Sequence, residues 1–328
     1  MGKPTPVVGI SLRREAVESI PVSPSILLVN LGTTRAPEPR AVREFLEEFL
    51  CDPMVVDYPS WLWRPILSKV LRSRPDKVAE LYRAIWTEEG NPLERGTELI
   101  AAALGRHLGG EVRHAYRYGS PSLRERLGPG ATRRTIVPLF PQRTGSTTGS
   151  IERAIDGVSG IEIRRIAPDD RGYIEAIGDL VHRSVGHEAP EHLVVSFHGI
   201  PVRYDRREGG MYRGDCERTF WALLKHIAWP RERATLSYQS RFGPEPWLRP
   251  ATASVIARLG SAGVKSIAVA TPGFVTEGLE TLEEIGIRGR KTFLEAGGKR
   301  FIRIPAVEAH PRFVASLATL VAETSHGG

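Results

Sequence analysis

The sequence predicts an α/β fold in which two Rossmann-like domains each carry a parallel sheet flanked by helices. Short apolar runs alternate with stretches of helical apolar spacing, and this alternation starts a second time near residue 170. The length of 328 residues also exceeds the usual size of one hydrophobic core. We therefore expect an N-terminal domain over 25–170 and a C-terminal domain over 171–328, whose last helix is a candidate to pack back on the first domain. Residues 1–24 mix charges, prolines and short apolar patches, and we expect a flexible tail there.

The elements of the first half follow from apolar spacing, turn residues and helix-capping hydroxyls. In order, we expect a strand at 26–31, a helix at 39–50, helical stretches at 60–73, 76–87 and 94–108, a strand at 112–118, a strand at 135–140, a loop at 141–149 whose hydroxyls cap the next helix, and a strand at 161–166.

The second half repeats the alternation with longer helices. We expect helices at 171–185, 212–228, 249–260, 277–296 and 311–324, and strands at 191–197, 234–239, 265–270 and 300–304. Helices between successive strands indicate βαβ units and a parallel sheet.

Composition excludes several classes of protein. Apolar residues make up 41% and charged residues 25%, as in ordinary soluble proteins, and no apolar run reaches the ~18–20 residues of a membrane span. The two cysteines, Cys51 and Cys216, lie far apart, which favours a reducing, cytoplasmic compartment and excludes a four-cysteine iron–sulfur cluster. The net charge of +7 comes without a zinc-finger, RNP or basic-helix signature, so we expect no nucleic-acid partner. No phosphate-binding glycine motif of nucleotide enzymes follows a strand.

A histidine stands at the end of a buried strand, in LVVSFHGIP at 193–201. Parallel sheets bind ligands where their strands end, so His198 lies where chemistry is usually carried out. Imidazole titrates near neutral pH and binds Fe²⁺ or Zn²⁺. The alternative is a core histidine that bonds to a backbone carbonyl.

An acidic helix face follows in TPGFVTEGLETLEEI at 271–285. Glu277, Glu280 and Glu284 are spaced i, i+3 and i+7, which places them on one face of an α-helix. Their mutual repulsion would raise the pKa of at least one carboxyl, which could then exchange protons near neutral pH. The alternative is that Glu277 complements the helix dipole while the others lie in water.

Three further segments are candidates for ligand contact, each with a structural alternative. Arg117 follows a strand and could pair either with a ligand carboxylate or with a structural partner. The segment SYQSRFGPEPW at 237–247 suits a wall beside a flat ligand, or a packed loop. The segment PSWLWRPIL at 59–67 suits either core or an exposed apolar lip that contacts a membrane or a hydrophobic ligand.

In their order and spacing, these segments resemble ferrochelatase, the enzyme that inserts Fe²⁺ into a porphyrin at the end of haem synthesis. The resemblance covers 26–320 and rests on LVNLGT (28–33), FLCDP (49–53), GNPL (90–93), RYG (117–119), PLFPQ (138–142), STTGS (146–150), SFHGIP (196–201), YQSRFG (238–243) and GFVTEGLETLEE (273–284).

The resemblance implies chelatase-type domains with the porphyrin in a cleft between them. It implies that His198 and Glu280 bind the metal and catalyse its insertion, and that Glu277 and Glu284 form an acidic path beside them. It also implies a set of substrate-binding residues: Leu31, Arg72, Arg74, Arg117, Tyr118, Ser146, Thr147 and Trp247. Fe²⁺ is then a substrate, and no tightly bound cofactor is expected.

The expected activity is metalation of protoporphyrin IX to protohaem with release of two protons. A coproporphyrin III ferrochelatase and a non-catalytic porphyrin or haem carrier are the alternatives. The apolar segment at 61–67 adds a candidate peripheral contact with the inner face of the membrane. The chain departs from the family pattern at Arg143-Thr144, where Tyr or Phe followed by Ser is usual, at Glu277, where Asp is common, and at Asn91, where Ser is usual.

Overall fold

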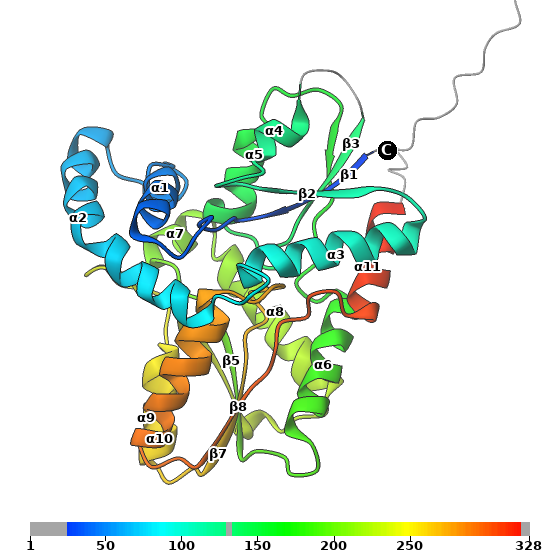
Figure 1. The fold of residues 1–328 in the computed structure, drawn as a ribbon. Helices are drawn as coiled ribbons and strands as arrows, with labels where there is room; N and C mark the ends of the chain where they lie inside the picture. Colours follow the sequence, from blue (N-terminus) through cyan, green and yellow to red (C-terminus); the bar gives the residue numbers. More distant parts are fainter. Residues whose placement is uncertain (1–24, 129–132, 323–328) are drawn as a thin grey trace, which may run out of the picture.

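The computed structural model describes residues 25–128 and 133–322, and it contains two parallel four-stranded sheets flanked by helices (Figure 1). The first sheet has the strand order β2-β1-β3-β4 and the second has the order β6-β5-β7-β8. The predicted α/β class, with two Rossmann-like sheets, is confirmed. The predicted tail at 1–24 lies outside the described residues.

The strands of each sheet come from one half of the chain. They are β1 (Ser25–Asn30), β2 (Val112–Tyr116), β3 (Arg134–Pro138), β4 (Ile161–Ile163), β5 (His192–His198), β6 (Ala234–Gln239), β7 (Ser266–Ala270) and β8 (Arg300–Arg303). Three strands end at least two residues earlier than predicted, β2 and β3 by two residues and β4 by three.

The helices alternate with the strands, and two of the helical segments have π-helical hydrogen bonding. They are α1 (Pro39–Leu50), α2 (Ser60–Ile85), α3 (Pro92–Leu108), α4 (Leu123–Leu127), the π-helix η1 (Gly145–Gly149), α5 (Ser150–Ala154), α6 (Arg171–Val185), α7 (Val202–Arg207), α8 (Met211–His226), the 3₁₀ turn η2 (Arg231–Arg233), α9 (Thr252–Ser261), the π-helix η3 (Leu279–Gly289), α10 (Arg290–Glu295) and α11 (Pro311–Ala322).

The central strands are largely apolar because helices cover both faces of each sheet. In β5, Val195 and Phe197 belong to one core cluster, while Val194 belongs to another with Val255 and Ile256 of α9. A strand whose alternate residues enter two cores is mostly apolar at successive positions. His198 lies at the point where β5 leaves the core.

Helices α1 and α2 stand beside the first sheet, at the left of Figure 1. The sequence predicted a break near Pro75, and this is wrong because α2 continues through it as one 26-residue helix. Pro75 is buried and lies between Leu71 and Ala79, which pack in the same cluster with α1. This packing outweighs the ~3 kcal/mol that an interior proline costs a helix.

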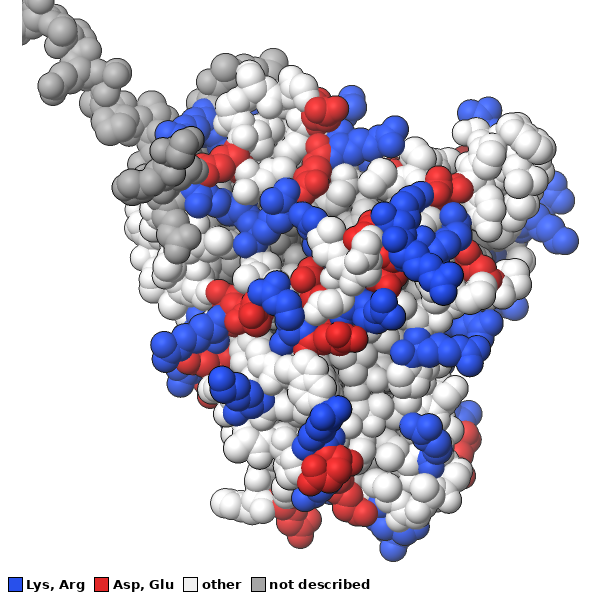
Figure 2. All heavy atoms as spheres, turned by 180° about the vertical axis from the view of Figure 1, so that it is seen from behind, with Lys and Arg blue, Asp and Glu red and all other residues white. Residues whose placement is uncertain are grey.

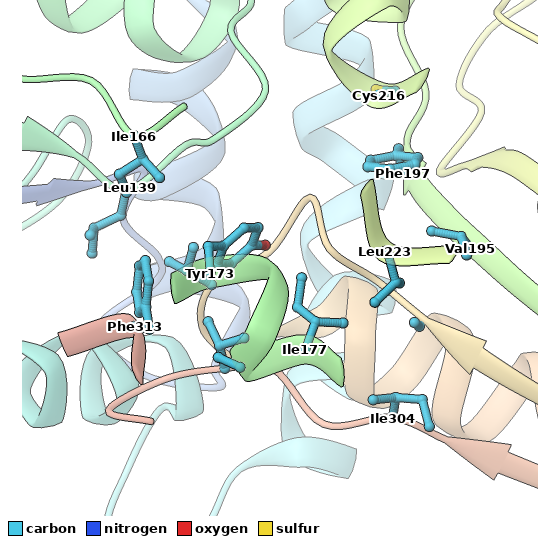
Figure 3. Packing of buried hydrophobic residues seen from close by; sticks show 14 of the residues in the cluster. Leu139, Ile166, Tyr173, Ile177, Val195, Phe197, Cys216, Leu223, Ile304 and Phe313 are labelled. Atoms are coloured by element: carbon cyan, nitrogen blue, oxygen red, sulfur yellow. The ribbon is translucent and has the colours of Figure 1, made fainter. Parts of the chain in front are cut away.

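One apolar core joins the two halves. Leu139 and Ile166 of the first half pack with Tyr173 and Phe313, and the same cluster continues to Phe197 of β5 (Figure 3). Helix α11 packs against both α3 and α6, so the end of the chain covers elements of both halves. The two sheets are thereby fixed relative to each other.

The charged surface is mixed. Figure 2 shows Lys and Arg side chains spread over one face of the molecule, with Asp and Glu side chains among them. Within 25–128 and 133–322, none of the helices combines the length and the hydropathy needed to cross a bilayer.

Candidate functional site

The carboxyl ends of the two sheets meet at one crevice. Asn30, the last residue of β1, donates from Nδ2 to the hydroxyl of Thr276 at 3.2 Å, in the loop that follows β7. Because parallel strands end at one edge of a sheet, His198 at the end of β5 lies at the edge that faces the first half. Ligands of open α/β sheets bind in such a crevice.

His198 is held by its backbone and by an aromatic neighbour. Its carbonyl oxygen accepts from the hydroxyl of Tyr212 at 2.6 Å, and its ring stands edge-on to Phe274 with centroids 6.1 Å apart. The next residue has to be glycine, because a Cβ on Gly199 would lie 2.6 Å from the carbonyl oxygen of Gln239. The imidazole is half-buried and keeps its ring nitrogens available at the crevice.

Glu280 lies in the first turn of η3, close enough to His198 for the two charges to interact. Burial raises the pKa of the Glu280 carboxyl, the positive charge of His198 opposes this shift, and Glu284 adds to it. A carboxyl in this setting can hold a proton at a pH where an exposed one cannot. The predicted joint role of His198 and Glu280 in metal binding stays a prediction.

Glu284 shares the site and is held by the residues that end β6. Its carboxylate accepts from the backbone N–H of Ser240 at 2.8 Å, from the Ser240 hydroxyl at 2.5 Å and from Gln239 Nε2 at 3.3 Å. Glu280 and Glu284 lie on one side of η3, since a π-helix has about 4.4 residues per turn.

The predicted common face of three glutamates is wrong for Glu277. The residue lies before η3, which begins at Leu279 after an extended Gly278. Its Oε1 accepts from Arg303 at 2.6 Å and from the backbone N–H of Ala306 at 3.0 Å. Glu277 therefore forms a largely buried ion pair beside β8, apart from the His198–Glu280 pair.

Arg117 and Tyr118 belong to a buried polar network, which accounts for the structural alternative for Arg117. Arg117 forms an ion pair with Asp52, and its Nε donates to the Ser150 hydroxyl at 2.7 Å. The Tyr118 hydroxyl donates to the same Asp52 oxygen at 2.8 Å, and the Tyr118 side chain is fully buried. The structure therefore does not offer these two side chains to a ligand.

The remaining first-half candidates lie at the crevice side of the first sheet. Leu31 follows β1 and is half-buried, and Ser146 and Thr147 are half-buried in η1. Thr144 caps η1, as predicted, by accepting from the Ser146 backbone at 3.0 Å. The backbone N–H of Gly145 donates at 2.9 Å to Glu208, the residue after α7, so η1 contacts the second half.

Arg74 bridges the mouth of the crevice. Its guanidinium carbon lies 4.2 Å from the ring centroid of Phe242, so α2 contacts the loop after β6. Burial lowers the pKa of Arg74. Arg72, one half-turn earlier, is exposed. The structure thus brings one of the two predicted arginines to the loop that contains the family motif YQSRFG.

Trp247 lines a cavity next to His198. The cavity has a volume of about 480 Å³, and Gly199, Gln239, Arg241 and Arg249 are among its walls. The indole Nε1 of Trp247 is buried and has no hydrogen-bond partner within the described residues. The cavity extends the site along the outer edge of β6.

Sequence reasoning missed two residues that structure the site. Gln239 ends β6 directly opposite His198 in the sheet register. Tyr82 of α2 is buried. Burial and the Glu280 charge raise the pKa of Tyr82, and a hydrogen bond from Thr33 opposes the rise. A polar side chain at the end of a buried strand was the available signal for Gln239. No local pattern distinguishes Tyr82 from other aromatic residues on an amphipathic helix.

His198 and Glu280 are the residues of the site that could hold a metal ion. Within residues 25–128 and 133–322, no set of three or more His, Cys, Asp and Glu side chains is arranged to hold a metal ion. His198 and Glu280 offer one imidazole nitrogen and one carboxylate, both of which Fe²⁺ accepts as ligands.

Two parallel four-stranded sheets, each flanked by helices, define the class as a two-domain α/β protein. A structure described as SirB from Bacillus subtilis with Fe³⁺ is similar in fold, with a TM-score of 0.53, 13% identity and coverage of 93% of this chain and 96% of that one. A multi-domain protein of Deinococcus radiodurans, described as structurally similar to chelatases, also matches, with a TM-score of 0.53, 14% identity and coverage of 92% of this chain and 55% of that one.

The chain belongs to the ferrochelatase family, whose model matches residues 23–325. A ferrochelatase of Aromatoleum aromaticum is 42% identical over 92% of this chain and 87% of its own length. A ferrochelatase of Polaromonas is 40% identical over the same shares. A coproporphyrin III ferrochelatase of Streptococcus mutans is 40% identical over 91% of this chain and 97% of its own length. The protein is accordingly a metal chelatase of the lyase class that works in haem biosynthesis.

Proposed function

We propose that the protein inserts Fe²⁺ into protoporphyrin IX, forming protohaem and releasing two protons. The observation that carries the proposal is the placement of Glu280 near His198: Gln239, which is opposite His198 in the sheet register, donates to the Glu280 backbone carbonyl at 2.8 Å. Family membership supports the reaction class. Fe²⁺ is a substrate in this reaction, and the proposal includes no resident cofactor or iron–sulfur cluster.

The chemistry requires a base and replaceable ligands at one place. Each pyrrole N–H of the free porphyrin has to lose its proton before the nitrogen pair can bind Fe²⁺, and the ion has to exchange waters for the ring nitrogens. His198 and Glu280 can exchange Fe²⁺-bound water for protein ligands, and either can accept a proton. Glu284, beside Glu280, extends the acidic group away from the ring centre. Glu277 is assigned a structural role because Arg303 holds it.

Cations and hydroxyls at the mouth of the crevice suit the propionates of the ring. Arg74 is partly buried at the mouth, Arg72 is exposed near it, and Ser146 and Thr147 lie half-buried in η1. Charge-assisted hydrogen bonds from such groups would orient the ring edge. Trp247 and Leu31 are the proposed apolar contacts of the macrocycle.

The exposed start of α2 favours an apolar porphyrin and a membrane contact. Trp61 is 77% exposed, and Leu62 and Ile66 are also exposed, which is unusual for such side chains in water. Protoporphyrin carries two propionates and is much less polar than coproporphyrin, which carries four. We propose that these residues receive it while the protein, located in the cytoplasm, contacts the inner face of the membrane peripherally.

Coproporphyrin III is the second candidate substrate, since a relative that is 40% identical has the name coproporphyrin III ferrochelatase. Anaerobic incubation with Fe²⁺ and each porphyrin, followed by visible spectroscopy, distinguishes the two. We expect faster metalation of protoporphyrin. Faster metalation of coproporphyrin would reverse the choice, and binding of both without metalation would identify a carrier.

The site assignment is tested with His198→Ala. We expect turnover to fall by at least about 100-fold, because the variant lacks both a ligand and a base, while porphyrin affinity measured by fluorescence changes little. His192→Ala is the matched control, since His192 lies at the other end of β5 and bonds to Thr235 at 2.8 Å. Equal turnover of the two variants would disprove the assignment.

A further inference from the structure

We propose that Gln239 is a positioning residue for metal insertion: its side-chain amide fixes the first turn of η3 to the end of β6 and so holds Glu280 toward His198. This inference rests on the proposed function of the His198–Glu280 site. Gln239 itself need not touch iron or porphyrin, because it acts through the residues that do.

The amide of Gln239 bonds to two of the three glutamates of η3, Glu280 and Glu284. Its Nε2 donates to the backbone carbonyl of Glu280 at 2.8 Å and to the Glu284 carboxylate at 3.3 Å. The side chain is only 3% exposed, so water does not replace these bonds. Gln239 is paired with His198 in the register of β5 and β6. One residue thus connects the strand of the imidazole to the helix of the carboxyl.

The orientation of the Gln239 amide is fixed by its bond with Ser196. Gln239 Oε1 accepts from the Ser196 hydroxyl at 2.7 Å, and Ser196 also contacts the hydroxyl of Thr252 in α9 at 2.7 Å. If the amide were flipped, its oxygen would face the Glu280 carbonyl and the Glu284 carboxylate, which are both acceptors. The network therefore allows one orientation, in which Nε2 faces η3.

The first turn of η3 needs such support. A π-helix is rare, and its hydrogen-bond geometry is less favourable than that of an α-helix. Loss of the hydrogen bond from Gln239 Nε2 to the Glu280 carbonyl would let this turn change its conformation, and the Glu280 carboxyl would move relative to His198. Ser240 bonds to Glu284 of the same helix. Its backbone is left-handed, with φ of 66°, which is uncommon for a residue other than glycine. Strain of this kind persists only where surrounding bonds maintain it.

Gln239→Met tests the proposal, because methionine has a similar size and cannot form these hydrogen bonds. We expect kcat for metalation to fall by about 30-fold, within the range for residues that orient metal ligands. The KM for porphyrin should stay within roughly two-fold, and amides of 279–289 should exchange hydrogen faster. Thr235→Val is the matched control: Thr235 lies near the other end of the same strand, and its hydroxyl bonds to His192 at 2.8 Å rather than to the Ser196–Thr252 network behind Gln239.

Three outcomes would overturn the inference: unchanged kcat in Gln239→Met, an equal loss in Thr235→Val, or unchanged exchange over 279–289. If Gln239→Met does not fold, Gln239→Glu decides, because it still accepts from Ser196 but repels Glu284; wild-type kcat in that variant overturns the inference as well. A wild-type protein that metalates neither porphyrin would instead refute the proposed function, and the exchange measurement would still report whether Gln239 holds η3.

Discussion

At the scale of single residues, the structure shows which of the predicted site residues bond to partners within the protein. Arg117 and Tyr118 match the family motif, but both bond to Asp52, which lies more than 60 residues earlier in the chain. A sequence pattern shows that an arginine follows a strand, and it does not show which carboxylate the arginine will meet. His198 was predictable because its strand run and the glycine after it are local signals.

The Asp52 network gives a prediction about acid stability. Burial alone would raise the pKa of Asp52, but hydrogen bonds from the Met54 backbone, Ser150 and Tyr118 outweigh it, and the charge of Arg117 adds to them, so the pKa is lowered. The network therefore stabilises the fold above the ordinary carboxyl pKa, and this contribution is lost as the pH falls through the lowered value.

We expect Asp52→Asn to lower the free energy of unfolding at pH 7 by about 2–3 kcal/mol, since it leaves the mostly buried Arg117 without its counter-charge. Denaturant titrations at several pH values measure the effect, and the difference from wild type should shrink toward pH 3. Asp57→Asn is the control, because Asp57 is exposed and its ion pairs should contribute less than about 1 kcal/mol. A difference that grows in acid would contradict this assignment.

At the scale of elements, the spacing of apolar residues predicted most helices. It could not show whether a helix has α-helical or π-helical backbone hydrogen bonds. The acidic segment was predicted as an α-helix from 277, yet it begins at Leu279 and is wound as a π-helix to Gly289. Spacing of i and i+3 holds a common face only in an α-helix, so the predicted face lost Glu277 and kept Glu280 with Glu284. The continuous α2 was missed for a related reason: a proline suggests a break, and tertiary packing decides whether the break occurs.

The start of α2 gives a prediction at this scale. Replacement of Trp61, Leu62 and Ile66 by Ser should reduce binding to anionic lipid vesicles by at least about ten-fold, because it removes the apolar side chains that would enter the interface. Thermal stability should change little, since these side chains are already exposed. Cosedimentation with vesicles measures the effect. Replacement of the exposed Ile287 of η3 and Leu294 of α10 by Ser is the control, and equal loss in both sets would contradict a specific membrane contact.

At the scale of the whole molecule, the alternation of strands and helices was sufficient to predict two parallel sheets. The sequence did not reveal how firmly the halves are joined. The core that runs from Leu139 to Phe197 includes residues of both, and α11 packs on both α3 and α6. Long-range packing of this kind leaves no periodic signal, because each contributing helix only shows that it has an apolar face.

The shared core predicts one cooperative unfolding transition for the folded part of the chain. Calorimetry should give a calorimetric enthalpy equal to the van't Hoff enthalpy, as for a single cooperative unit. The replacement Leu139→Ala, in the shared cluster, should move the whole transition to lower temperature without splitting it. Two resolved transitions, of which only one moves, would show that the halves unfold separately.

The contact of Arg74 with Phe242 has a consequence for the choice of substrate. The guanidinium already has an aromatic partner across the mouth of the crevice, in an arrangement that contributes about 0.5–2 kcal/mol. A ligand group that binds Arg74 has to compete with Phe242. A carboxylate can do so, since its charge-assisted hydrogen bond contributes about 1.5–3 kcal/mol. An esterified or decarboxylated porphyrin lacks a carboxylate that could replace the contact of Arg74 with Phe242. On the proposed function, we therefore expect the Arg74–Phe242 contact to favour acidic macrocycles over neutral ones.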